Sequence, residues 1–217
     1  TILHPAEADS KDWSEWEDQI ESGLDDLAEF IEAPLPKPLT FIVFRDRSEL
    51  LATTCGKNWA GGIYDGIVKL FLNEDGSLPS TRIVHHELVH ALLERSFKFR
   101  APLWFEEGLA EVFEHRAKPL DPGFASLLKS RVYVPISTLN DGFNLLEDGP
   151  EANAAYLQSR ALILWLQQDN GTMSLGESLE LLNGATLSRE DFTDRVLGSD
   201  FSMEIYFQFL EKLSAPK

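Results

Sequence analysis

STRIVHHELVHALLERSFKFRAPLWFEEGLAEVFE, residues 80–114, is the stretch that decides both the fold and the expected chemistry. Ser80 is a residue type that caps helix amino termini, and an apolar pattern at helical spacing follows it to about Phe97. Pro102 interrupts this pattern, because proline has no backbone N–H to donate. A second helix fits residues 103–117. The stretch therefore predicts two helices joined by a short turn.

The first of these helices carries an HExxH pattern formed by His86, Glu87 and His90. Residues i and i+4 of a helix share one face, so both imidazoles can reach the same metal ion. Glu87 is too close along the chain to be a third ligand, but it can reach a water bound to that ion. Zinc lowers the pKa of such a water towards ~7, and a carboxylate can take its proton. We therefore expect Glu87 to be a general base.

Two histidines do not complete a metal site, and the second helix supplies further candidates. Glu107, Glu111 and Glu114 fall at i, i+4 and i+7, opposite an apolar stripe. An acidic face opposite an apolar one is ordinarily just solvated, so the pattern alone does not establish a ligand. Two features favour a ligand: the short turn makes the two helices neighbours, and Gly108 is easier to explain if something approaches closely there.

The other histidines are expected to lie outside the metal site. His85 points about 100° away from His86 on a helix, so we expect it beside the ligands or at the surface. His4 and His115 have no partners in register, and we expect both to be solvated.

Composition narrows the class of protein. The 217 residues are 43% hydrophobic, and no apolar run reaches the roughly 18 residues of a membrane span. The net charge of −17, from 36 acidic and 19 basic residues, opposes binding to nucleic acid or to anionic membranes. The single cysteine, Cys55, excludes an internal disulfide and a cysteine-based zinc site. A metal ion must then be held by histidine and carboxylate.

The order of predicted elements favours an α+β fold over an alternating parallel sheet. The chain length suits a single domain over 1–217. The expected elements before the metal segment are a helix at 12–33, a strand at 39–44, a short helix at 48–55 and a strand at 67–72 that has one wet side or lies at an edge. After it, 123–150 is expected to be mostly loop with a short helix near 124–130, followed by helices at 152–168, 174–183, 188–197 and 202–213.

The amino terminus leaves the compartment open. The chain begins at Thr1, and its first ten residues have neither a basic region nor an apolar core of a signal peptide. A processed export signal fits this beginning, so we expect a bacterial periplasmic or secreted protein, with the cytoplasm as the alternative.

The motifs resemble those of a known family. HELVH at 86–90 followed by PLWFEEGLAE at 102–111 is similar to the gluzincin pattern, HExxH then WxxEGxA, of small peptidase MA-like domains. The resemblance implies a minimal thermolysin-like catalytic fold: a small amino-terminal sheet whose edge strand flanks the cleft, a zinc-binding helix and a mostly helical second half. It also implies that Glu107 is the third ligand of one Zn²⁺ ion, and that Glu111 hydrogen-bonds a zinc-bound histidine.

The resemblance extends, less specifically, over about residues 38–213. GGIYDG at 61–66 and the following strand look like the family's edge strand. We expect this edge strand, at 67–72, to bind an extended peptide by strand addition, and Gly62, Ile63 and Tyr64 are candidate substrate-binding residues. Tyr156, in a helix similar to the family's YAQSxAL segment, is a candidate for stabilising the oxyanion, and the alternative is a tyrosine at the edge of the core. Glu106 stands where aminopeptidases of the clan have asparagine, so their recognition of a peptide amino terminus is not carried over.

Three functions are consistent with these patterns. The first is a zinc peptidase that hydrolyses peptides or proteins, with His86, His90 and Glu107 as ligands and Glu87 as base. The second is a gluzincin-like domain that keeps zinc but serves binding or assembly, its cleft covered by the loop at 131–150. The third is a helical protein without metal, in which the motif is a coincidence. The oligomeric state does not follow from the sequence.

Overall fold

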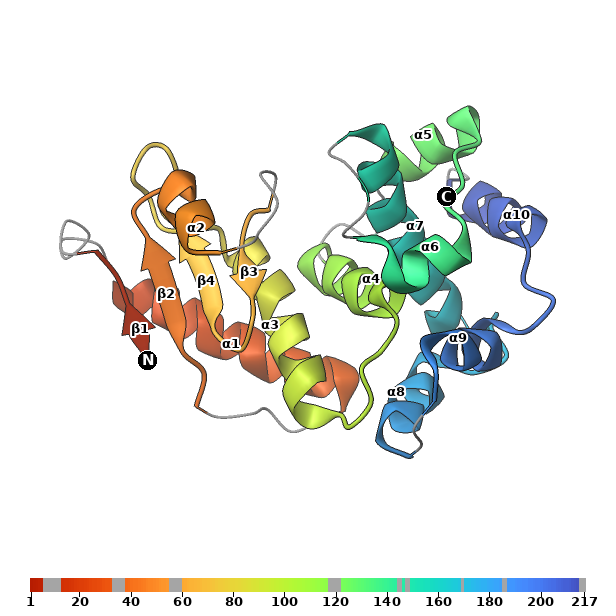
Figure 1. The fold of residues 1–217 in the computed structure, drawn as a ribbon, viewed down its shortest axis with the longest axis horizontal. Helices are drawn as coiled ribbons and strands as arrows, with labels where there is room; N and C mark the ends of the chain where they lie inside the picture. The colour runs from red at the N-terminus through yellow and green to blue at the C-terminus, as the bar shows by residue number, and fades with distance from the viewer. Residues whose placement is uncertain are drawn as a thin grey trace. The chain divides into compact units, whose positions relative to one another are not determined.

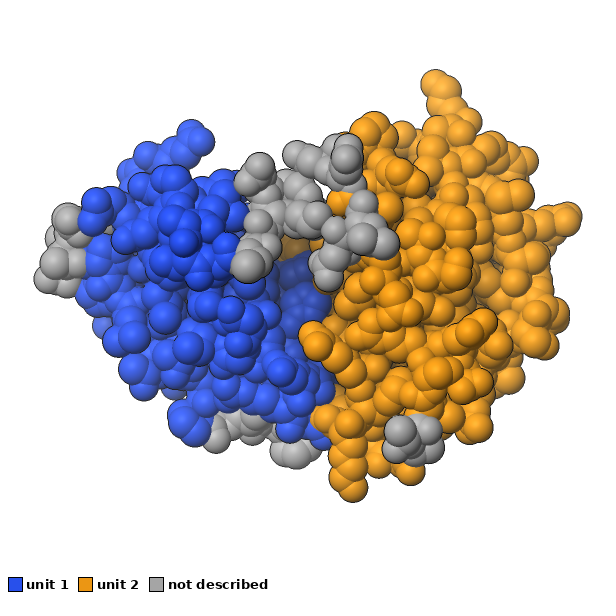
Figure 2. Space-filling view, viewed as in Figure 1, with its two compact units in different colours: residues 1–96 blue, residues 97–217 orange. Residues whose placement is uncertain are grey.

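The computed structural model of the chain describes residues 1–5, 13–32, 38–54, 60–116, 122–143, 146, 149–168, 170–184 and 187–214. Cys55 and the predicted ends of the first helix, residues 12 and 33, lie outside these ranges. The chain forms two compact units, residues 1–96 and 97–217 (Figure 2). The first combines a sheet with helices and the second is helical, which confirms the α+β class. The single catalytic domain stays a prediction.

The sheet of the first unit has four short strands in the described residues (Figure 1). Their order across the sheet is β1-β2-β4-β3, where β1 is Ile2–Leu3, β2 is Phe41–Phe44, β3 is Ile63–Tyr64 and β4 is Val68–Phe71. Strands β1, β2 and β4 run parallel, and β3 is antiparallel to β4. The sheet is therefore mixed.

Placing the strand at 67–72 at an edge was wrong, because β4 lies between β2 and β3. The chain before β4 folds back on it and pairs Ile63 with Lys69 and Tyr64 with Val68. Gly66, at φ +95°, allows the tight reversal between the two strands. The edge strands are β1 and β3, and two-residue strands are too short to show an alternating pattern in the sequence.

One face of the sheet is the core of the first unit. Phe41 and Val43 of β2 and Val68 and Leu70 of β4 are buried on it. Helices α1 (Trp13–Ile31) and α3 (Thr81–Ser96) lie along this face (Figure 1). Trp16 of α1 packs edge-on against Phe41, with ring centroids 6.3 Å apart. Burial of these apolar side chains holds the metal-motif helix α3 on the sheet.

The opposite face of the sheet is more open. Helix α2 (Arg47–Thr53) lies on this side, where the Arg47 guanidinium stands 5.0 Å from the centroid of the Phe71 ring. Lys69 also points to this face, and its ammonium is 2.6 Å from the Asp65 carboxylate. The predicted wet side of the second strand is half-buried, with the Lys69 side chain 15% exposed.

The amino terminus of α3 is capped as expected. The Ser80 hydroxyl accepts a hydrogen bond from the Arg82 backbone N–H at 3.3 Å, and the Ser80 carbonyl accepts from Val84 N–H at 3.2 Å. A hydroxyl in this position satisfies one of the backbone donors that a helix leaves unpaired at its start.

The second unit consists of helices packed around α7. Its helices are α4 (Leu103–Glu114), α5 (Pro122–Ser130), α6 (Ile136–Asp141), α7 (Pro150–Gln167), α8 (Leu175–Gly184), α9 (Arg189–Leu197) and α10 (Met203–Ser214). Helix α7 contacts α4, α5 and α8, while α10 packs on α5 and α9 packs on α6. Among the described residues, no helix of either unit combines the length and apolarity that crossing a bilayer requires.

Two predictions for this unit have different outcomes. The capping box of α9 is confirmed, since Ser188 Oγ accepts from Asp191 N–H at 3.0 Å and donates to the Asp191 carboxylate at 2.6 Å. These hydrogen bonds hold the pKa of Asp191 below its ordinary value. The loop predicted over 131–150 was wrong in part, because α6 forms within it. Six residues are too few for a helical period to stand out, and α6 is stabilised by its packing against α4 and α9.

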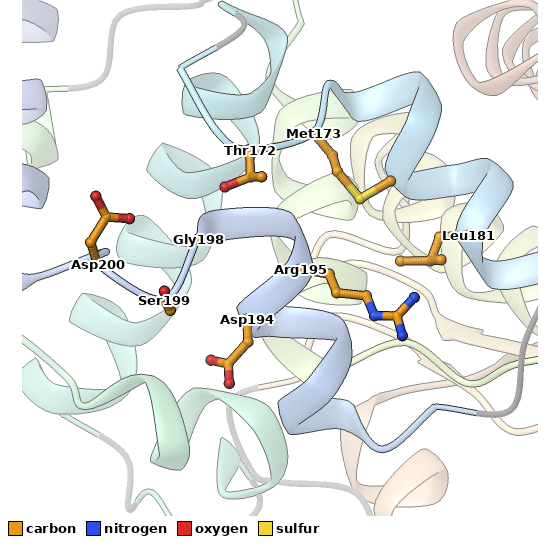
Figure 3. Close-up of a pocket in the computed structure, with 8 residues that line it drawn as sticks. All are labelled: Thr172, Met173, Leu181, Asp194, Arg195, Gly198, Ser199 and Asp200. Carbon is orange, nitrogen blue, oxygen red and sulfur yellow. The ribbon is translucent and has the colours of Figure 1, made fainter.

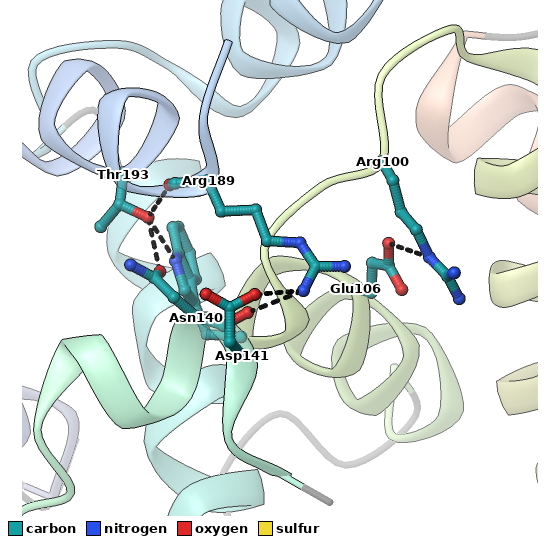
Figure 4. A network of polar contacts seen from close by, with 7 residues as sticks. Arg100, Glu106, Asn140, Asp141, Arg189 and Thr193 are labelled. Carbon is teal, nitrogen blue, oxygen red and sulfur yellow. Dashed lines mark hydrogen bonds and ion pairs between the residues drawn. The ribbon is translucent and has the colours of Figure 1, made fainter.

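A buried hydrogen-bond network ties α4 to α6 and α9 (Figure 4). The indole Nε1 of Trp104, which is fully buried, donates to Thr193 Oγ1 at 3.0 Å. The Thr193 hydroxyl donates in turn to Asn140 Oδ1 at 2.7 Å. Trp104 is the tryptophan of the WxxEG segment, so this network fixes the start of the helix that carries Glu107.

Removal of the Thr193 hydroxyl is expected to destabilise the protein. Thr193→Val leaves the buried Trp104 N–H without its acceptor and Asn140 without its donor, a loss of about 1–3 kcal/mol in the free energy of unfolding. Thr193→Ser keeps the hydroxyl and is expected to lose less. Denaturant unfolding of the two variants measures the difference, and equal losses would contradict a role for the network.

Candidate metal centre

The two histidines of the HExxH segment lie together on one face of α3. Their ring centroids are 5.2 Å apart, and both side chains are half-buried. The core side of the helix is occupied by Val84, Leu88 and Leu92, which are almost fully buried. Burial of that apolar side turns the imidazoles of His86 and His90 away from the core. The helical spacing therefore produces the expected pairing.

Glu87 lies under the start of β3. It is 6% exposed, and a Cβ atom placed on Gly62 would be 2.9 Å from its Cγ and 3.0 Å from its Oε1. The Glu87 side chain fills the space that a side chain at position 62 would need, so a glycine fits there. The expected base and one of the expected substrate-binding residues are thus direct neighbours within the first unit.

His85 does not lie at the surface. It is 9% exposed and points at α1, where a Cβ atom on Gly23 would lie only 2.1 Å from His85 Nε2. Its 100° separation from His86 directs it to the neighbouring helix, and Gly23 provides the room. The sequence does not show this contact because the two residues are 62 positions apart.

Helix α4 places its glutamates as the pattern predicts. Glu107, Glu111 and Glu114 are half-buried, while Phe105 and Leu109 are fully buried on the apolar side. The acidic face is therefore less exposed than an ordinary solvated helix face, which favours a role for its carboxylates.

The close approach at Gly108 comes from helix α7, so this glycine does not favour a metal ligand as the sequence suggested. A Cβ atom on Gly108 would lie 2.4 Å from the backbone oxygen of Ser159 and 2.8 Å from Cγ1 of Ile163. Backbone atoms cannot move aside as a flexible side chain can. The glycine that follows Glu107 is therefore required by the crossing of α4 and α7.

Gly108→Ala is expected to lower the free energy of unfolding by about 1–3 kcal/mol, because the added methyl group overpacks the α4–α7 contact. Gly176→Ala in α8 is a matched control, since a Cβ atom there meets open space. The control should be neutral or stabilising by up to about 1 kcal/mol, from helix propensity. Denaturant midpoints of both variants give the comparison, and similar midpoints would exclude this explanation of Gly108.

The predicted ligands form a group that can hold a metal ion. His86, His90 and Glu107 each offer one ligand atom, and these atoms all lie within 4.8 Å of one another. Two imidazole nitrogens and one carboxylate oxygen suit zinc, a metal that accepts both kinds of donor. His86, Glu111 and Glu114 form a second group by the same distance criterion.

We expected His115 to be solvated and without partners, and this was wrong. Its Nδ1 lies 3.4 Å from Glu111 Oε2, and its Nε2 lies 4.0 Å from Glu114 Oε1. His115 directly follows α4, four residues beyond Glu111, and its Nδ1 is also 3.0 Å from the Glu111 carbonyl oxygen. The role of Glu111 towards a metal-bound histidine stays a prediction.

Tyr156 and Glu106 lie in different surroundings of the second unit. Tyr156 is half-buried on α7, with its ring edge-on to Phe143 at a centroid distance of 5.2 Å. Its role towards an oxyanion stays a prediction. Glu106 is 9% exposed, and its Oε1 lies 3.9 Å from Nε of Arg100 (Figure 4).

A surface hollow of about 460 Å³ in the second unit contains none of the predicted site residues (Figure 3). Thr172, Leu181, Asp194 and Arg195 contribute to its lining. No sequence motif pointed to it, and it offers no histidine to a metal ion.

Comparison of the sequence with models of protein families finds no match, and comparison with curated proteins finds none either. The gluzincin resemblance therefore stays a prediction from the sequence motifs.

Proposed function

We propose that this chain is a zinc-dependent peptidase of the gluzincin, peptidase MA-like, type. The observation that supports this most is the group formed by His86, His90 and Glu107, whose ligand atoms lie within 4.8 Å of one another. These are the three residues that the motif resemblance designates as ligands. Three protein ligands are also the number found in catalytic zinc sites, which keep a further position open.

Zinc held by these residues would supply Lewis acidity, which makes water a stronger nucleophile and polarises the peptide carbonyl. The reaction needs a base as well, and Glu87 is the carboxylate beside the two histidines. We assign Glu87 to take a proton from the attacking water as the water oxygen bonds to the carbonyl carbon. Glu87 then delivers the proton to the nitrogen that leaves when the C–N bond breaks.

The surroundings of Glu87 suit this task. The side chain is buried and is confined between α3 and the Gly62 backbone, so it loses little freedom when it meets water and substrate. Tyr156 is our candidate for donating a hydrogen bond to the oxyanion, and Glu111 for orienting a ligand histidine.

We also propose a minimal thermolysin-like arrangement, and the order of elements supports this: a small sheet, the HExxH helix and a helical second half. The edge strand on the α3 side is β3, which contains Ile63 and Tyr64. We propose that an extended peptide adds to this edge, where backbone hydrogen bonds give affinity that depends little on sequence.

Zinc content tests the ligands. We expect about one zinc ion per chain after purification without chelators, because the three ligands together bind a single ion. His90→Ala should lose most of this zinc, because it removes one of two imidazoles, whereas His4→Ala, in the same unit, should keep it. Elemental analysis measures both. A wild-type chain that contains no zinc and takes none up on reconstitution excludes the proposal.

Turnover tests the base. Glu87→Gln keeps the shape of the side chain but cannot accept a proton, so hydrolysis of a peptide library should fall by about 10²–10⁴-fold while zinc content is unchanged. Glu17→Gln, at an exposed position of α1, is the control and should behave as wild type.

Mass spectrometry of the library products gives the rates. Equal activity of Glu87→Gln and wild type would refute the assigned base. Zinc binding without any turnover by the wild type would favour the binding domain instead.

A further inference from the structure

Arg95, in the last turn of α3, donates hydrogen bonds to three residues in two other segments of the first unit. Its Nη1 donates to the Pro38 carbonyl at 2.8 Å, just before β2. Its Nη2 donates to the Gly66 carbonyl at 2.9 Å, in the reversal between β3 and β4. Its Nε donates to the Tyr64 hydroxyl at 3.2 Å, in β3 itself. One side chain thus links the helix of the HExxH motif to the whole β3–β4 hairpin.

The hairpin meets α3 at two points. Gly62 and Tyr64 are two residues apart and therefore face the same side of the strand, towards α3. Gly62 lies against Glu87, and Tyr64 reaches Arg95, which is eight residues further along α3, or about 12 Å. The β3 arm of the hairpin therefore runs alongside α3, and the contacts at Gly62 and Tyr64 hold it there.

The Tyr64 contact is part of the same link. The Glu94 carboxylate, one residue before Arg95 on α3, also acts on the Tyr64 phenol. Burial, helped by the Glu94 carboxylate, raises the pKa of Tyr64 above its ordinary value. The phenol therefore stays protonated, and its oxygen accepts from Arg95 Nε.

The geometry requires arginine in particular. All three acceptors of Arg95 are uncharged oxygens in different directions, so the contact depends on the number and direction of donors and not on ion pairing. A guanidinium presents five N–H donors in a rigid plane, whereas the ammonium of lysine is a compact group on a flexible stem. Lysine at this position cannot reach all three acceptors at once.

We infer that Arg95 is a positioning residue, which holds the β3–β4 hairpin against α3 and so keeps the Gly62 backbone beside the Glu87 carboxylate. This inference rests on the proposed function for its consequence in catalysis. A peptide that adds to β3 is then presented to the base at a fixed distance. Loss of Arg95 loosens the strand that binds the peptide but leaves His86, Glu87 and His90 in their helix.

Amide hydrogen exchange tests the link without reference to activity. In Arg95→Met, amides of residues 62–69 should exchange faster, by about two- to tenfold for each hydrogen bond lost. Arg95→Lys should be intermediate, and Tyr64→Phe, which removes one acceptor of three, should show a smaller change if Arg95→Met folds poorly. Arg82→Met, an exposed arginine at the start of the same helix, is the control. Unchanged exchange in Arg95→Met, or an equal change in Arg82→Met, overturns the inference.

Steady-state kinetics on peptides that the wild type cleaves test the consequence. Arg95→Met should raise KM by about two- to tenfold per hydrogen bond lost, with zinc content near wild type, because the strand that binds the peptide loses its support. A fall in kcat with KM unchanged overturns the positioning role. If the wild type cleaves no peptide, the proposed function fails, and hydrogen exchange alone then decides whether Arg95 holds the hairpin.

Discussion

The structure depends on three glycines at which a helix packs unusually closely on its neighbour. Gly23 and Gly62 lie against side chains of α3, and Gly108 of α4 lies against α7. The side chains of the HExxH helix fill space that a methyl group would occupy at Gly23 and Gly62, and Gly108 lets α4 lie directly on α7. A Cβ atom at any of these glycines would meet its neighbour at 2.9 Å or less, well inside van der Waals contact. Each of the two motif helices is thereby held by close contacts, and at Gly108 the neighbour is backbone that cannot move aside.

These constraints act on the same helices that present the candidate chemistry. Helix α3 buries apolar residues on the sheet side and turns His86 and His90 away from it, while Arg95 at its end binds the β3–β4 hairpin. Helix α4 is anchored at Trp104 by the Thr193–Asn140 network and at Gly108 by α7. A hydrolytic site requires groups held in place before the substrate arrives, and such anchoring is how a protein provides that.

Interactions between residues close in sequence were predicted correctly, and several distant ones were not. The pairing of His86 with His90 and the capping box at Ser188 follow from the fixed geometry of a helix and appeared as expected. The edge position of β4 was wrong because pairing with the two-residue strand β3 has no sequence signature. The burial of His85 was missed for a related reason, since its neighbour Gly23 lies on another helix.

By itself, the sequence determined the α+β class, most helices, and a histidine pair with a glutamate between them, because helical period and capping chemistry act over four residues or fewer. It also named Glu107 through a motif resemblance. Only the tertiary structure decided which strand forms the edge beside α3 and that Gly108 serves the α4–α7 crossing. Only the tertiary structure also revealed that Arg95 hydrogen-bonds the β3–β4 hairpin, whose Gly62 end lies against Glu87. Such contacts join residues tens of positions apart, and they depend on how elements pack and not on any local preference.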